Sequence, residues 1–156
     1  MSDVYKKLAE HLDSLPAGYP PTQSGVELKI LKKLFTPQEA EIAASLEMMP
    51  AKPEAIARKV KMDPAELEPI LDAMAEKGLI IRNKRKGETT FMAAQFVVGI
   101  WEFHVKSLDE ELIRYFNEYV PELMKTVWER TPTKQLRVIP VSENIEAETA
   151  IMAYDQ

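Results

Sequence analysis

The chain has 156 residues, of which 46% are hydrophobic, which suits one ordinary soluble domain with a single core. Its net charge of -5 argues against a general nucleic-acid binder, because such binding depends mostly on lysines and arginines that neutralise phosphates. There is no cysteine, so disulfides, thiolate metal sites and cysteine nucleophiles are excluded within the chain.

The positions of the two histidines and the hydropathy of the chain argue against a metal site and a membrane location. His11 and His104 lie far apart in the sequence, without a partner at the spacing that a metal site requires, so we expect no metal site. No apolar run approaches the ~20 residues that span a bilayer, and the N-terminus lacks the apolar region of a signal peptide. We therefore expect a cytoplasmic protein with no membrane partner.

The N-terminal part predicts two helices separated by a loop. Apolar residues at helical spacing predict a short amphipathic helix over residues 3–14, with Ser2 or Asp3 as its cap. Residues 16–25 are rich in proline and glycine, which is typical of a loop. A second helix is expected over residues 26–34.

A capping box predicts the third helix. Thr36-Pro37-Gln38-Glu39 combines a capping side chain, a proline at the first helical position and a glutamate three residues after the cap. These residues satisfy backbone donors that a helix leaves free at its start. The helix should begin at Pro37 and end before Pro50.

The next two predicted helices have the spacing of a helix-turn-helix. Pro53 opens a helix that runs to about Val60, and Asp63-Pro64-Ala65-Glu66 repeats the pattern of cap, proline and glutamate. Over residues 64–77, apolar residues at i, i+3, i+4 and i+7 form a stripe, and Gly78 supplies the stop.

A hairpin is predicted to follow. Residues 79–84 and 89–94 are β-prone runs, joined by the four-residue loop Arg85-Lys86-Gly87-Glu88. The fold class is therefore mainly α: a winged helix-turn-helix with its helix-turn-helix at 53–77, its wing at 79–94, and additional C-terminal helices.

The last third extends this fold. Phe96–Phe103 is nearly continuous apolar sequence, which predicts either a buried helix or an interaction surface. A long helix is expected over Leu108–Arg130, bent or broken near Pro121. Gln135–Val141 predicts a strand. The winged-helix domain thus covers 1–141, with its helical extension at 96–130, and the tail 142–156 is expected to lead toward a missing domain.

Catalytic motifs are missing from the sequence. Most carboxylates at helix starts, such as Glu39 and Glu54, suit the helix dipole without any chemistry. There is no glycine-rich phosphate loop, nucleophile elbow or metal-binding pair, so we do not expect an enzyme.

DNA binding is an alternative function that the helix-turn-helix spacing and a basic wing support. The basic residues that could contact phosphates are Arg82, Lys84, Arg85 and Lys86. The helix that would enter a groove carries only Lys77 against a set of acidic residues, which would repel phosphates. These acidic residues are Asp63, Glu66, Glu68, Asp72 and Glu76.

Protein association is the function that the aromatic C-terminal third favours, either with another protein or as a homodimer. Aromatic residues are the types that anchor interfaces, although aromatic residues at helical spacing are more often core. The residues predicted to form an interaction surface are Phe96, Ile100, Trp101, Phe103, Tyr115 and Tyr119.

Four strings, at residues 15–31, 34–37, 74–80 and 95–103, carry a family resemblance. They include Gly18-Tyr19-Pro20 and Phe96-Val97-Val98-Gly99-Ile100. Together they resemble the N-terminal region of a family of bacterial and archaeal 4Fe-4S ferredoxin-type proteins, and the resemblance covers essentially the whole chain. In that family a winged-helix domain precedes a cysteine-rich half that binds the clusters.

The resemblance implies an accessory domain of an iron–sulfur protein. The cysteines that hold the 4Fe-4S clusters would lie beyond Gln156, so no cluster ligand can be assigned to this chain. The expected partners are the rest of its own polypeptide or a redox partner protein, with a homodimer as a further form of association and DNA as the alternative partner.

Overall fold

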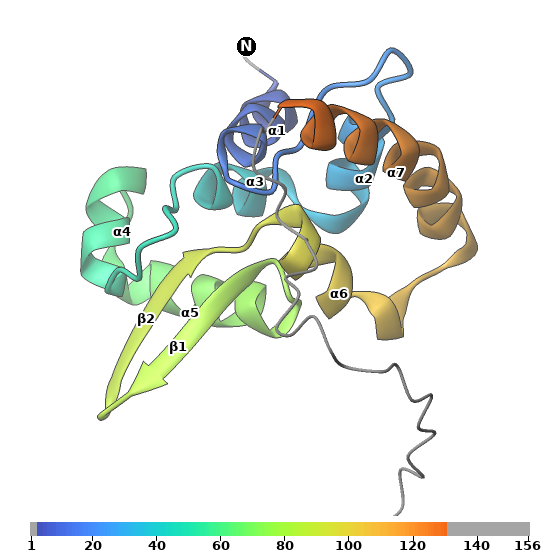
Figure 1. The fold of residues 1–156 in the computed structure, drawn as a ribbon. Coiled ribbons are helices and arrows are strands. Elements are labelled where there is room, and N and C mark those ends of the chain that lie inside the picture. Colours follow the sequence, from blue (N-terminus) through green and yellow to red (C-terminus); the bar gives the residue numbers. More distant parts are fainter. Residues whose placement is uncertain (1–2, 131–156) are drawn as a thin grey trace, which may run out of the picture.

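Helices account for most of residues 3–130, the part of the chain that this computed structural model describes (Figure 1). One antiparallel hairpin interrupts them. The predicted strand at 135–141 and the tail 142–156 lie outside the described residues. The helices and strands are α1 (Val4–Ser14), α2 (Val26–Leu34), α3 (Pro37–Ala43), α4 (Pro53–Val60), α5 (Pro64–Glu76), β1 (Ile80–Arg85), β2 (Glu88–Ala93), α6 (Trp101–Phe103) and α7 (Glu110–Arg130).

The predicted helix starts are confirmed by their caps. The Asp3 side chain accepts a hydrogen bond from the Tyr5 amide at the start of α1. At α3 the capping box is complete: the Glu39 amide donates to the Thr36 hydroxyl, and the Thr36 amide donates to the Glu39 carboxylate at 2.8 Å. Asp63 caps α5 in the same way as Asp3 caps α1. These bonds satisfy donors that a helix cannot pair internally.

The helices form two connected groups. α1 packs on α2 and α3, and α7 lies along α2 (Figure 1). α4 and α5 contact each other across a short turn, and α5 also packs against β1. The buried side chains of both groups form one core, which includes Leu8, Ile30, Leu71 and Phe91.

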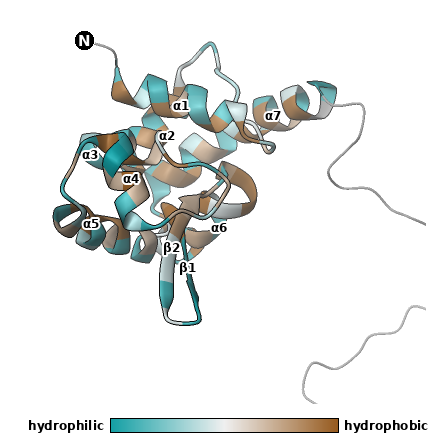
Figure 2. Ribbon diagram, turned by 90° about the vertical axis from the view of Figure 1, so that its left-hand side faces the viewer, coloured by the Kyte–Doolittle hydropathy of each residue, from teal (hydrophilic) through white to brown (hydrophobic). Residues whose placement is uncertain are grey.

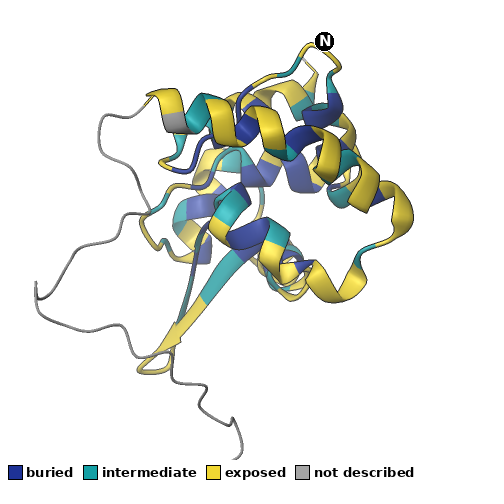
Figure 3. Ribbon diagram, turned by 45° about the vertical axis from the view of Figure 1, so that its right-hand side comes forward, coloured by how far each residue is buried: buried dark blue, intermediate teal, exposed yellow. Residues whose placement is uncertain are grey.

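The hairpin has a tighter turn than the sequence predicts. Its register runs from Ile80 opposite Ala93 to Arg85 opposite Glu88, so the loop is the two residues Lys86 and Gly87 and not four. Both have positive φ, 51° and 83°, as a two-residue turn between twisted strands requires. The tip is hydrophilic and exposed and projects from the helices (Figures 2 and 3).

A segment before α4 covers the other edge of β2. The amides of Ala51 and Phe91 each donate to the other's carbonyl at 2.9 Å, and the Ala93 amide donates to the Glu47 carbonyl at 2.8 Å. This pairing joins the chain between α3 and α4 to the hairpin and supports two strands that would be marginal alone.

The apolar tract Phe96–Phe103 is not the buried helix that we considered. Val97, Val98 and Gly99 have non-helical backbone angles, and only the short α6 follows. Local side chains take up the backbone donors: the Gly99 amide donates to the Glu102 carboxylate at 2.6 Å. A break near Pro121 is also absent, because α7 runs from Glu110 to Arg130 as one helix. Across residues 3–130, no helix is long and apolar enough to cross a membrane.

Candidate interaction surface

Three of the six residues predicted to form an interaction surface lie in the core. Phe96, Ile100 and Tyr119 are buried, so this part of the prediction is wrong. The reason is a cluster of rings from distant segments: Phe96 lies 4.7 Å from Tyr19 and 5.7 Å from Tyr119 between ring centroids. Aromatic burial of this kind stabilises a fold and leaves nothing for a partner.

The other three lie at or near the surface. Trp101 is half-buried and stacks on Phe116, with ring centroids 3.3 Å apart. Tyr115 is half-buried and donates its hydroxyl proton to the Glu111 carboxylate at 2.8 Å. Phe103 is 54% exposed and is the one open aromatic residue of the predicted set.

Two valines that the sequence did not single out join Phe103. Val98 is 78% exposed and Val105 is 56% exposed. Val105 stands between His104 and Lys106, outside any apolar run, and no sequence signal marks it. We call residues 98–105 the apolar linker, since this segment between β2 and α7 carries half of the exposed large hydrophobic side chains found in the described residues.

Phe103 is held in place by the end of α5. A Cβ added to Gly78 would lie 2.5 Å from the Phe103 Cβ, and Gly78 has φ +78°. The backbone of Gly78 therefore touches the Phe103 side chain directly. This contact positions Phe103 from one side, while its other side faces solvent.

The outer face of α5 is acidic, as the sequence indicated, and it also takes up Arg82. Arg82 Nη1 lies 2.7 Å from Asp72 Oδ1 and 3.8 Å from Glu76 Oε1. Hydrogen bonding to Asp72 raises the pKa of Arg82 above its ordinary value. Of the four predicted nucleic-acid contacts, Arg82 is thus committed to α5.

The three remaining cations are exposed at the hairpin tip. Lys84, Arg85 and Lys86 surround the turn. Glu88 beside them pairs with Lys52 at 2.8 Å. The tip is a small positive patch, and Arg82 lies on the same strand two residues before Lys84.

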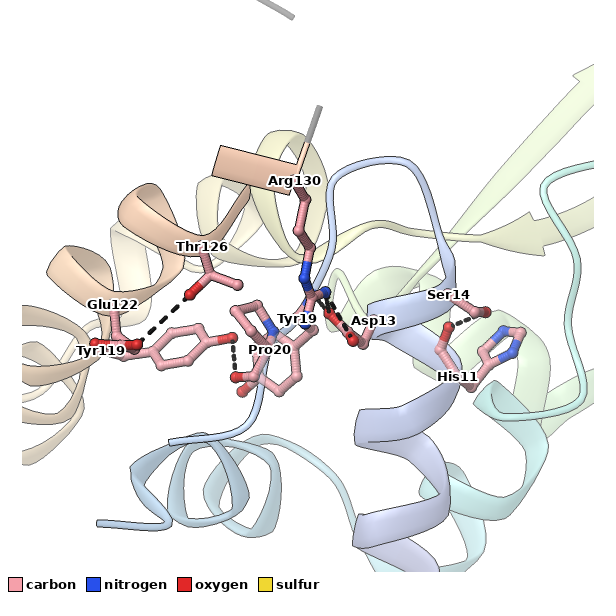
Figure 4. A network of polar contacts seen from close by, with 9 residues as sticks. All are labelled: His11, Asp13, Ser14, Tyr19, Pro20, Tyr119, Glu122, Thr126 and Arg130. Carbon is pink, nitrogen blue, oxygen red and sulfur yellow. Dashed lines mark hydrogen bonds and ion pairs between the residues drawn. The ribbon is translucent and has the colours of Figure 1, made fainter. Parts of the chain in front are cut away.

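A polar network joins the end of α7 to the end of α1, away from the hairpin (Figure 4). Arg130 Nη1 donates to both carboxylate oxygens of Asp13, at 2.8 and 3.0 Å, and Asp13 also accepts from the Tyr19 amide at 2.9 Å. The Tyr119 hydroxyl donates to the Pro20 carbonyl at 3.1 Å. Burial raises the pKa of Tyr119, so its phenol stays protonated as a donor.

The side chains of this chain do not fit a 4Fe-4S cluster. Such clusters are held by cysteine thiolates, and the chain has none. Over residues 3–130, no group of three or more His, Asp or Glu side chains is arranged to hold a metal ion. Any cluster of the kind that the resemblance implies would need ligands from elsewhere.

Comparisons with known proteins add no relative: no protein family matches the chain, and no curated protein or solved structure is similar to it.

Proposed function

We propose that residues 1–141 form an accessory winged-helix domain of a 4Fe-4S ferredoxin-type iron–sulfur protein. In this proposal the domain acts in protein association and not in catalysis, and works in the cytoplasm. The order of α4, a short turn, α5 and an antiparallel hairpin supports the winged-helix assignment. The pairing of Ala51 with β2 supports it further, since it supplies a third strand-like segment.

The apolar linker carries the proposal of association. Val98, Phe103 and Val105 expose large hydrophobic side chains within eight residues, and exposed apolar side chains gathered in one short segment favour an interaction site. Phe103 is an aromatic side chain, a type that often anchors interfaces, and its Cβ is held close to Gly78.

Three partners follow from the proposal: a cysteine-rich half of the same polypeptide, a separate redox partner protein, or a second copy. If the cysteine-rich half or the redox partner protein holds the clusters, this domain needs no cysteines of its own. The domain would then position the cluster-bearing part and leave electron transfer to it.

The test compares a variant of the apolar linker with a matched surface variant. F103S/V105S removes two exposed apolar side chains, whereas M124S removes one of similar exposure, 50%, on α7. The chain is sedimented at rising concentration, alone and mixed with a separately prepared 4Fe-4S ferredoxin. We expect association that F103S/V105S weakens by roughly tenfold or more and that M124S leaves unchanged. No association in either mixture, or equal loss in both variants, would contradict the proposal.

DNA binding through the hairpin tip is the second candidate function, favoured by the exposed Lys84, Arg85 and Lys86. Three phosphate contacts predict a slope of log K against log salt of about -2.7. A gel-shift titration with random duplex at low salt measures it. Each reversal to Glu at the tip should reduce the slope by about 0.9, whereas R82E should not. If the duplex is not shifted even at low salt, protein association is the better supported function.

A further inference from the structure

A pocket of about 250 Å³ lies between α1, the loop before α2, and α2 itself. Ala9, Tyr19, Pro21 and Leu28 supply apolar wall. Its size is slightly below that of pockets for drug-sized ligands, so it suits a small group or a single side chain. None of the residues that line it belongs to the apolar linker or to the hairpin tip. Its ligand is therefore independent of the proposed function.

Glu27 is the unusual member of the pocket lining. It is only 4% exposed, although it carries a carboxylate. Thr22 fixes its orientation, because the Thr22 amide and hydroxyl donate to Glu27 Oε2 at 3.2 and 2.5 Å. The Tyr19 hydroxyl donates at 2.8 Å to the backbone carbonyl of Glu27 and not to the side chain.

The second carboxylate oxygen of Glu27 is left for another group. Glu27 Oε1 accepts no hydrogen bond from residues 3–130. It is not fully enclosed either, because among the described side chains the fully enclosed polar atom without a partner is His11 Nε2. No side chain in the described part of the chain forms an ion pair with Glu27. Thr22 and the start of α2 stabilise the Glu27 carboxylate but no cation neutralises it, so the pocket favours a positively charged occupant.

The other charged residues of the pocket favour the same sign. Glu10 and Asp13 line it with Glu27, against the single cation Lys6. Asp13 is already paired with Arg130, which leaves Glu10 and the nearly buried Glu27 as the carboxylates of the lining without an ion pair in the described residues. The pocket thus combines an apolar wall with an excess of negative charge.

The available geometry selects among cations. A guanidinium binds carboxylates best through two parallel hydrogen bonds, but Thr22 occupies Oε2. A hard metal ion needs several oxygen ligands, and the described residues offer no such group. An ammonium needs one acceptor oxygen, and an attached alkyl chain would use the apolar wall. We propose that this pocket binds an alkylammonium group, with Glu27 Oε1 as its hydrogen-bond acceptor and counter-ion.

The experiment is an NMR titration of the whole chain with n-butylammonium, with 1-butanol as the uncharged analogue. We expect saturable shifts of the Tyr19 and Leu28 amides with n-butylammonium and none with 1-butanol. E27Q keeps the shape of the side chain and removes its charge, so binding should weaken by roughly tenfold or more. A9L places a larger side chain in the apolar wall and keeps the carboxylate, and it should also weaken binding. E66Q, an exposed change on α5, should leave binding unchanged.

The results separate the proposal from its rivals. Equal binding by E27Q, equal binding of 1-butanol, or no saturable shift with the wild-type chain would each overturn it. A second arm uses N-acetyl-lysine-N-methylamide, which presents the same ammonium group on a peptide backbone. Binding of this compound would identify a lysine side chain of a protein as a source of the group, and binding of n-butylammonium alone would identify a free amine.

Discussion

Replacing Gly78 with alanine tests whether the end of α5 positions the apolar linker. Gly78 has φ +78°, and its added Cβ would lie 2.5 Å from the Phe103 Cβ. The left-handed conformation costs an alanine about 1–2 kcal/mol. The contact with Phe103 adds about 1–3 kcal/mol, because a Cβ moves only with its backbone and α6 would have to shift. G78A should therefore destabilise the domain by about 2–5 kcal/mol.

Gly87 supplies the matched control for this prediction. It has φ +83° and no heavy atom within 4 Å of an added Cβ, so G87A incurs the conformational cost of about 1–2 kcal/mol alone. Urea unfolding followed by circular dichroism measures both variants. The difference between them isolates the contact with Phe103.

A double-mutant cycle with F103G completes the test, since removing the Phe103 Cβ removes the clash. The coupling between G78A and F103G should be favourable by about 1–3 kcal/mol. The same displacement should weaken association in G78A and leave it intact in G87A. The reasoning is refuted if G78A is no more destabilising than G87A, or if the cycle shows no coupling.

Three further predictions concern pH, a buried hydroxyl and iron. Burial lowers the pKa of His11, so near and below pH 6.5 the unfolded chain binds a proton that the folded domain does not. Stability should therefore be full above about pH 6.5 and decline below it. In H11N the urea midpoint should stay constant between about pH 5.5 and 7. Y119F removes a buried hydrogen bond to Pro20 and should cost about 1 kcal/mol of unfolding free energy, whereas Y115F at the surface should cost less than about 0.5 kcal/mol; similar losses would count against the network. The purified chain should stay colourless after anaerobic reconstitution with iron and sulfide, and an absorption band of a cluster would contradict the assignment of all cluster ligands to other residues.

Helix starts could be predicted because their signals are local. The caps Asp3, Thr36 and Asp63 bond to amides two or three residues away, so a short string contains both partners. The same holds for the prolines at the first positions of α3, α4 and α5. α7 shows the limit of such a rule. Its Pro121 is exposed, as is Asn117 one turn earlier, so water can satisfy the carbonyl that loses its helical donor.

The length of the hairpin loop could not be predicted for a different reason. Lys86 adopts φ 51°, a conformation that asparagine or glycine usually signals, so the sequence Lys-Gly did not mark a two-residue turn. Extending the pairing to Arg85 and Glu88 shortens the loop and carries both charges to the tip.

Hydropathy could not separate core from surface in the last third. Phe96 faces the core and Val98 faces solvent, although both belong to one apolar run with no regular period. The burial of Tyr119 depends on a carbonyl at Pro20, 99 residues earlier in the chain. Contacts of this range follow from tertiary packing, which a local pattern does not contain.

The pairing of Arg82 governs how the charges of α5 and the hairpin combine. The sequence contains an acidic helix and a basic hairpin, which leaves open whether they act separately. In the fold α5 packs against β1, and Arg82 binds Asp72 and approaches Glu76. A phosphate at Arg82 would have to displace this pair and would then lie beside two carboxylates, which repel it. A protein partner with basic side chains would instead be attracted, because this face has more carboxylates than cations. We therefore expect the face formed by α5 and β1 to disfavour phosphate, so that R82E should change DNA affinity less than a reversal at Lys84, Arg85 or Lys86.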